Sequence, residues 1–236
     1  MSLNLHRRTV LAGMAGLAFA GSSNAIADDT PASPVAQGIL ANNALALAFE
    51  PPTRTELPDV TLIGGKDREL EISDLKGRTL LMPLWAEWCA PCLSELPDFA
   101  RLQQKYANDK FAIVPILTGT QKRLTSTNLA DVLVFLHAGI FEPLMEKNYR
   151  DTLMKAMARK GGGVEIPCNL LVAPDGRVIG REIGAKRSDD EQAMVASDNK
   201  SQLIKRAEAG ETLSLWGKEE GEQFAAAMAN GFLAHG

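Results

Sequence analysis

The most informative stretch of this 236-residue chain reads Trp85-Ala86-Glu87-Trp88-Cys89-Ala90-Pro91-Cys92, with two cysteines three positions apart. The apolar run at 79–84 predicts a buried strand before it, and apolar residues at helical spacing between 93 and 102 predict a helix after it. Cys89 is therefore expected where a strand leads into the N-terminus of a helix. Unpaired backbone amides and the positive end of the helix dipole favour a thiolate at such a position.

The spacing of the two cysteines fits redox chemistry between thiols and disulfides. One thiol can attack a disulfide, and the other can release the mixed product. We expect Cys89 to attack and the more shielded Cys92 to resolve, while Pro91 stiffens the first helical turn. The alternatives are a zinc half-site or two structural cysteines. Zinc needs a second ligand pair, and the three cysteines and three histidines provide no second Cys-X-X-Cys and no His-X-X-X-His.

Two segments resemble the thioredoxin superfamily. They are Trp85 to Cys89 and the stretch Val164-Glu165-Ile166-Pro167, which is followed by the apolar strand and Pro-Asp-Gly turn at 170–180. The resemblance implies that Pro167 is cis and faces the disulfide, and that the backbone of Ile166 pairs with a substrate chain. It also implies substrate contacts for Trp88 and Pro91. From the residues alone, an ordinary trans proline opening an edge strand is the alternative.

Within this superfamily, the chain is most similar to the TlpA-like thiol-disulfide reductases, with the cytochrome c maturation reductases as relatives. The similarity rests on Cys92-Leu93-Ser94-Glu95-Leu96-Pro97 and on a hairpin expected at 57–78, and it covers about residues 57 to 186. It implies an α/β, thioredoxin-like fold with a central mixed β-sheet flanked by helices. An N-terminal β-hairpin extension, a central insertion and an extra C-terminal helix would be added to it. The insertion is expected to contain helices near 128–137 and 149–159.

Glu95 is the candidate for handling protons at the cysteines. A carboxylate one turn after Cys92, near the start of the helix, can tune both thiols. The alternative is an exposed charge that only favours the helix dipole. Pro83 stands where thioredoxin has a buried acid, and Pro115 stands where it has the neighbouring lysine. Each proline removes a backbone donor from an expected central strand, which predicts a bulge or a shifted register and leaves proton transfer to Glu95 or to water.

Cys168 follows the expected cis-proline directly, where thioredoxin-like chains carry Thr or Val. One hypothesis places its sulfur beside Cys89 and Cys92. Three soft ligands there could hold Cu(I), and Cys168 could also trap a rearranged disulfide. The alternative is a small buried residue that only contributes to packing.

The N-terminus resembles a bacterial twin-arginine export signal. Arg7 and Arg8 precede an apolar run that ends near Ala20, and Ala25-Ile26-Ala27 offers a cleavage site. The run is about 11 residues long, whereas roughly 20 are needed to span a bilayer. We therefore expect a periplasmic protein with a processed signal peptide, and membrane anchoring by an uncleaved signal is the alternative.

The rest of the chain is expected to elaborate one domain. We predict a signal peptide at 1–27, an N-terminal arm with a short helix at 28–50, a thioredoxin-like domain at 51–212 and a C-terminal helical extension at 213–236. The arm has helical spacing from 39 to 49, before a proline pair ends it. The extension has helical spacing over 216–234, with Phe224, Met228 and Phe232 on one apolar face.

Composition and resemblance together narrow the partners. A net charge of −4 argues against nucleic acid as a partner. Three cysteines cannot build a disulfide framework, so the Cys89–Cys92 disulfide is the expected redox group, without a further cofactor. The resemblance implies a thiol-disulfide oxidoreductase that reduces exported clients, such as apocytochrome c or copper-site assembly proteins, and is reduced by a membrane electron donor. The alternatives are a Cu(I) carrier using Cys89, Cys92 and Cys168, and a peroxidase-like antioxidant protein. Against the latter, Ala86 replaces the Thr of the Thr-X-X-Cys pattern.

Overall fold

The computed structural model of the protein describes residue 35 and residues 38–119, 124–149, 151–158, 165–184, 205–206, 208–212 and 214–232. All of them belong to one compact unit, Ala32–Gly236. The predicted twin-arginine signal and its cleavage site lie outside these residues. Within them, none of the helices combines the length and the apolar character needed to cross a bilayer.

The described residues form one eight-stranded mixed sheet around β3, Thr79–Trp85, which is buried along its whole length. A strand with helices on both faces must be apolar on both sides, and the run at 79–85 meets that need. The other strands are β1 (Thr61–Ile63), β2 (Glu69–Glu71), β4 (Phe111–Ile113), β5 (Ile116–Leu117), β6 (Leu144–Glu146), β7 (Cys168–Val172) and β8 (Val178–Ile183). Their order is β2-β1-β6-β5-β3-β7-β8, with β4 also beside β3. β3 runs parallel to β4 and β5 and antiparallel to β7.

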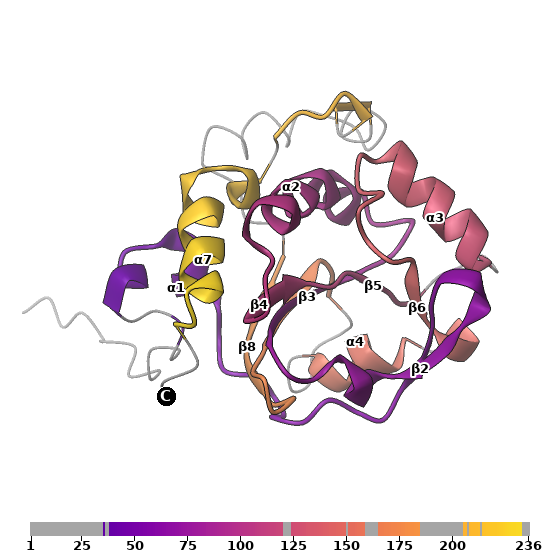
Figure 1. The fold of residues 1–236 in the computed structure, drawn as a ribbon, viewed down its shortest axis with the longest axis horizontal. Coiled ribbons are helices and arrows are strands. Elements are labelled where there is room, and N and C mark those ends of the chain that lie inside the picture. Colours follow the sequence, from indigo (N-terminus) through magenta and orange to yellow (C-terminus); the bar gives the residue numbers. More distant parts are fainter. Residues whose placement is uncertain are drawn as a thin grey trace, which may run out of the picture. The chain divides into compact units, whose positions relative to one another are not determined.

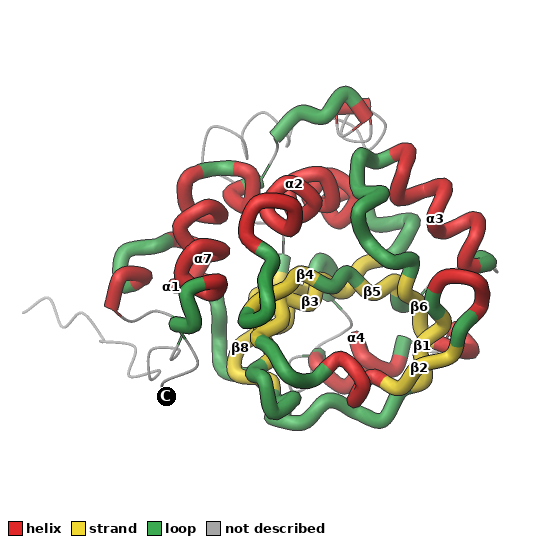
Figure 2. The backbone as a smooth tube through the Cα atoms, viewed as in Figure 1, coloured by secondary structure: helices red, strands yellow, loops and turns green. Residues whose placement is uncertain are grey.

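Helices cover both faces of this sheet (Figure 1, Figure 2). α2 (Ala90–Tyr106) and α3 (Ser126–Phe135) lie on one face, and α4 (Thr152–Met157) lies on the other. The buried side chains form two clusters, one on each face. The α2-side core includes Leu81, Trp85, Cys89, Cys92, Leu96, Phe99, Leu129 and Leu171. The α4-side core includes Leu80, Met82, Leu84, Leu153, Met157, Cys168 and Leu170.

This architecture confirms the predicted α/β, thioredoxin-like fold. β1 and β2 pair antiparallel as the expected N-terminal hairpin, and β1 joins the sheet through β6. The central insertion contains α3 and α4, at 126–135 and 152–157. Both helices lie close to the predicted ranges, and α4 is the shorter of the two.

The predicted irregularity at the prolines takes the form of a break between β4 and β5. The ladder from β3 continues on either side of this break through two bonds, from the Val114 N–H to the Leu81 carbonyl (2.8 Å) and from the Thr118 N–H to the Trp85 carbonyl (2.9 Å). Backbone polar groups point alternately to the two neighbouring strands, so those of Pro83 face the same neighbour as those of Leu81 and Trp85. Pro83, however, has no N–H to donate. Pro115 lies in the gap itself. The register of β3 is therefore retained, and its parallel neighbour is split in two.

The N-terminal arm is interrupted where one helix was predicted over 39–49. A 3₁₀ turn at Gly38–Leu40 is followed by α1, Ala44–Ala48. Asn43 separates them, because its side-chain oxygen accepts the N–H of Ala46 over 3.0 Å and so caps a new helix. The arm thus contains the predicted short helix, α1, over fewer residues than 39–49.

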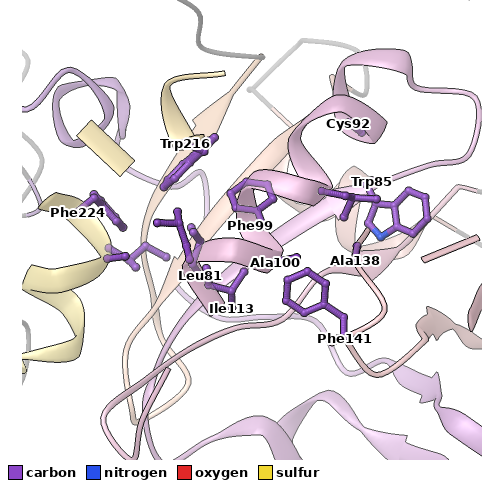
Figure 3. Close-up of a cluster of buried hydrophobic side chains, with 14 of the residues drawn as sticks. Leu81, Trp85, Cys92, Phe99, Ala100, Ile113, Ala138, Phe141, Trp216 and Phe224 are labelled. Carbon is purple, nitrogen blue, oxygen red and sulfur yellow. The ribbon is translucent and has the colours of Figure 1, made fainter. Parts of the chain in front are cut away.

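The C-terminal helix packs back onto the domain. It begins later than predicted, as α7 (Glu219–Ala229) after a 3₁₀ turn at Leu215–Gly217. Phe224 and Met228 are fully buried, which confirms the predicted apolar face. Phe224 lies 5.4 Å, centroid to centroid, from Trp216, whose ring lies 5.1 Å from that of Phe99 in α2 (Figure 3). The extra helix is thus part of the α2-side core.

Candidate functional site

The two cysteines lie at the junction that the sequence predicts. β3 ends at Trp85, α2 begins at Ala90, and Cys89 occupies the N-cap position between them. Cys89 and Cys92 form a disulfide with their Cα atoms 5.3 Å apart. The Sγ atom of Cys89 accepts the backbone N–H of Cys92 over 3.3 Å. The same donor can stabilise a thiolate at Cys89 once the disulfide is reduced.

The two sulfurs differ in their surroundings. Cys89 is 5 % exposed and Cys92 is 2 % exposed, so the resolving position is the more enclosed of the two. Pro91, in the first turn of α2, occupies a position whose N–H has no partner within the helix. The proline therefore stiffens this turn without removing a helical hydrogen bond.

Pro167 has the conformation that the sequence predicts, because the peptide bond between Ile166 and Pro167 is cis. β7 begins at the next residue, Cys168, which pairs with Leu84 of β3. One step further along this antiparallel ladder, Pro167 comes beside the end of β3, where the chain turns towards the disulfide. Ile166 is half-buried and packs against both cores.

Trp88 forms a partly exposed apolar surface next to Cys89. Trp88 is 37 % exposed, whereas Trp85 and Trp216 are almost completely buried. The indole N–H donates to the carbonyl oxygen of Gly119 over 3.0 Å and so fixes the ring against the loop after β5. The site thus offers a rigid aromatic surface beside the first cysteine.

Glu95 lies one turn after Cys92 and is only 1 % exposed. The alternative of an exposed charge in the first turn was therefore wrong.

Cys168 does not join the other two cysteines. It belongs to the α4-side core together with Leu84 and Leu170, whereas Cys89 and Cys92 belong to the α2-side core. Successive side chains of a strand lie on opposite faces of the sheet, so Cys168 lies on the face opposite to that of Pro167. The hypothesis of a Cu(I) site built from all three sulfurs was wrong. Across the described ranges, no group of three or more His, Cys, Asp and Glu side chains is placed to hold a metal ion.

The comparisons with known proteins place the chain in a family. The family model described as the AhpC/TSA family matches residues 53–181, which is more than half of the chain. The chain belongs to the AhpC/TSA family. The matched residues run from the N-terminal hairpin to β8 and include the disulfide and the cis-proline.

Relatives of this AhpC/TSA-family chain include proteins named for thiol chemistry. The thioredoxin-like protein YneN of Bacillus subtilis (strain 168) is 38% identical over 61 residues, which are 26% of this chain and 35% of YneN. The thiol-disulfide oxidoreductase ResA of Bacillus anthracis is 25% identical over 134 residues, 57% of this chain and 71% of ResA. Among solved structures, a putative thiol:disulfide interchange protein DsbE from Chlorobium tepidum is 21% identical, with a TM-score of 0.45, over 66% of this chain and 99% of that chain. The alignment with YneN spans only about a third of its length.

Three buried polar residues of this AhpC/TSA-family chain were not predicted from the sequence. Asn169 and Glu182, on neighbouring strands, are both 0 % exposed and hydrogen-bonded to each other. Asp98, in the second turn after Cys92, accepts a hydrogen bond from Ser214 over 2.8 Å, and burial raises its pKa to about 6, against the opposing effect of Arg101. The available signal was weak, since it consisted of single polar residues within otherwise apolar strand and helix patterns.

Proposed function

We propose that the protein is a thiol-disulfide oxidoreductase that reduces disulfides in client proteins. The observation that carries this proposal is the Cys89–Cys92 disulfide, held at the N-terminus of α2 beside the cis-proline Pro167. A helix N-terminus favours a thiolate, and two cysteines in one turn can exchange a disulfide with a client and then release it. The name of ResA, a thiol-disulfide oxidoreductase, supports the same class of activity.

The proposed reaction starts from the dithiol. The Cys89 thiolate attacks one sulfur of a client disulfide, which forms a mixed disulfide and releases the other client sulfur as a thiolate. Cys92 then loses its proton and attacks the Cys89 sulfur. The Cys89–Cys92 disulfide forms, the bond to the client breaks, and the client leaves with two thiols and two electrons. Glu95 is proposed to receive and return the proton of the resolving thiol, because it is buried one turn away.

The client would bind over Cys89, the less buried of the two cysteines. Trp88 offers an apolar face, Pro91 shapes the first turn of α2, and the backbone of Ile166 is proposed to pair with an extended client segment ahead of Pro167. Main-chain pairing of this kind is largely independent of client sequence, so it suits an enzyme that acts on several proteins.

The compartment and partners are proposed from the sequence. A twin-arginine-type signal at 1–27 would export the chain to the periplasm, followed by an arm at 28–50, the catalytic domain at 51–212 and the extension at 213–236. The proposed clients are apocytochrome c or copper-site assembly proteins. Because the periplasm is oxidising, continued reduction would require a membrane electron donor.

The test uses the mature protein, a protein disulfide as substrate, and the two cysteine variants. Cys89→Ser is expected to abolish reduction, whereas Cys92→Ser is expected to accumulate a mixed disulfide that mass spectrometry detects. A redox titration against glutathione determines the direction, and a potential far above that of glutathione would contradict a reductase. Hydroperoxide consumption, measured in parallel, would instead support the antioxidant alternative. If Cys89→Ser reduced the substrate disulfide at the wild-type rate, Cys89 would not be the nucleophile.

A further inference from the structure

A buried carboxylate, Glu146, is the last residue of β6 and lies next to the end of β5. Leu117 of β5 pairs with Met145 of β6 in a parallel ladder, so Thr118 and Glu146 come beside each other one residue later. Both are almost completely buried. The hydroxyl of Thr118 donates to the Oε1 atom of Glu146, and this bond joins the chain after β5 to β6.

The same carboxylate holds the first turn of α4. Its Oε2 atom accepts the backbone N–H of Thr152 over 2.7 Å, and its Oε1 atom accepts that of Leu153 over 3.1 Å. Removing a carboxylate from water is unfavourable unless protein donors replace the lost hydrogen bonds, and here three donors do so. Glu146 therefore connects three parts of the chain, which are β6, the start of α4 and Thr118 after β5.

Gly119, the next residue after Thr118, packs against the same turn of α4. Its backbone is left-handed, with a φ of +62°, and a Cβ atom at this position would collide with the methyl group of Met154 and lie 3.3 Å from the Cβ atom of Asp151. Only glycine permits this conformation and this close approach. The carbonyl oxygen of Gly119 accepts the indole N–H of Trp88 over 3.0 Å. The connection that starts at α4 thus reaches the aromatic ring beside the first cysteine.

We infer that Glu146 and Thr118 are positioning residues that hold the ring of Trp88 in place for client binding. They act through the backbone of Gly119, which follows Thr118 and accepts the indole N–H. The inference rests on the proposed function, in which Trp88 offers the client an apolar face. A side chain that is already fixed loses little conformational freedom when a client binds, so its contacts contribute more to affinity. Neither positioning residue takes part in the thiol chemistry.

Thr118→Val tests the inference, because it removes the hydroxyl and nearly keeps the shape of the side chain. Glu146 retains its two backbone donors in α4, and the Thr118 N–H still donates to the carbonyl oxygen of Trp85, so the fold should be retained. The KM for the reduction of insulin is expected to rise about three- to tenfold, with kcat within about twofold, because binding must now order the ring. The rate of exchange with oxidised glutathione should equal that of the wild type, since this small disulfide needs only Cys89.

A second readout needs no client. Of the three tryptophans, Trp85 and Trp216 are almost completely buried, so quenching of the fluorescence by acrylamide reports mainly on Trp88. The quenching constant is expected to rise in Thr118→Val, because the ring is no longer held. Thr118→Ser keeps the hydroxyl and is the matched control, with the KM and the quenching constant of the wild type.

A double-mutant cycle separates the positioning of Trp88 from a general loss of packing. Trp88→Phe keeps an apolar ring but lacks the N–H that Gly119 accepts. Adding Thr118→Val to Trp88→Phe is therefore expected to leave the KM for insulin at the value of Trp88→Phe alone. Two independent increases of the KM, each present in the double variant, would overturn the inference.

An unchanged KM or an unchanged quenching constant in folded Thr118→Val would also overturn it, because a purely structural role lowers stability without moving either value. If Thr118→Val does not fold, Glu146→Gln serves instead. Its amide replaces one acceptor oxygen by a donor, so the quenching constant should again rise, and an unchanged value would overturn the inference. If the wild type does not reduce insulin, the proposed function fails, whereas the quenching experiment still shows whether Thr118 holds Trp88.

Discussion

Asp98 shows what a single buried acid does to this protein at the scale of one residue. Its carboxylate is completely buried, accepts a bond from Ser214 and is paired with Arg101, yet burial dominates and raises its pKa to about 6. The native state therefore holds a proton that the unfolded state, with an ordinary carboxyl near 3.8, has already released. Stability contributed by the neutral form is present below about pH 4 and is lost as the pH rises to about 6.

The Asp98→Asn variant is expected to lack this loss. Between pH 4 and pH 7, the free energy of unfolding of the wild type should fall relative to the variant by on the order of 3 kcal/mol. Denaturant titrations of both proteins at the two pH values measure the difference. Asp59→Asn, at an exposed carboxyl, is the control and should follow the wild type. A wild-type-to-variant difference that does not change with pH would contradict the assignment.

Residue-scale prediction from sequence succeeded where chemistry and local order coincide. Cys89 and Cys92 were predicted because a Cys-X-X-Cys after an apolar strand leaves few alternatives. The cis bond at Pro167 was predicted from the resemblance to the thioredoxin superfamily, since the residues alone favour a trans proline. Of the two interpretations of Cys168, the small buried packing residue was confirmed, because the alternation of side chains along β7 places its sulfur in the α4-side core. Asn169, Glu182 and Asp98 were missed because their burial depends on strands and helices distant in sequence.

At the scale of elements, local signals located the long segments and failed at the short ones. β3, α2 and α3 lie close to their predicted ranges because apolar spacing over seven or more residues is a strong signal. The arm helix begins at Ala44 rather than at 39, because Asn43 caps a new helix there. The prolines predicted an irregular strand, but only the ladder shows that Pro115 splits β4 from β5 while β3 stays continuous.

Asn43 is therefore expected to stabilise the arm more than an ordinary exposed residue. Its side chain caps α1 through Ala46 and also donates to the carbonyl oxygen of Glu220 in α7 over 2.9 Å. Asn43→Ala should lower the free energy of unfolding by about 1–2 kcal/mol. Asn42→Ala, at the exposed neighbouring position, is the control and should change it by less than about 0.5 kcal/mol. Equal effects of the two substitutions would show that the cap contributes nothing.

At the scale of the described unit, the disulfide and the C-terminal helix share one core. Phe224 of α7 stacks 5.3 Å from Phe49 of the arm and lies 5.4 Å from Trp216, which contacts Phe99 of α2. β3 leads into the N-terminal end of α2, the C-terminal extension packs against this helix, and the N-terminal arm packs against the extension. The two sulfurs must return to the same relative position after each reaction cycle, and a firmly packed helix keeps them in that position.

Phe224→Ala tests this arrangement. Removing a fully buried ring should lower the free energy of unfolding by about 3–5 kcal/mol, and by the same amount in the oxidised and the reduced protein. Phe135→Ala, at a ring that is 61% exposed on α3, is the control and should stay within about 0.5 kcal/mol of the wild type. Because the loss is common to both redox forms, the reduction potential of folded Phe224→Ala should equal that of the wild type. A shifted potential would mean that packing of the aromatic cluster changes the relative stability of the dithiol and the disulfide.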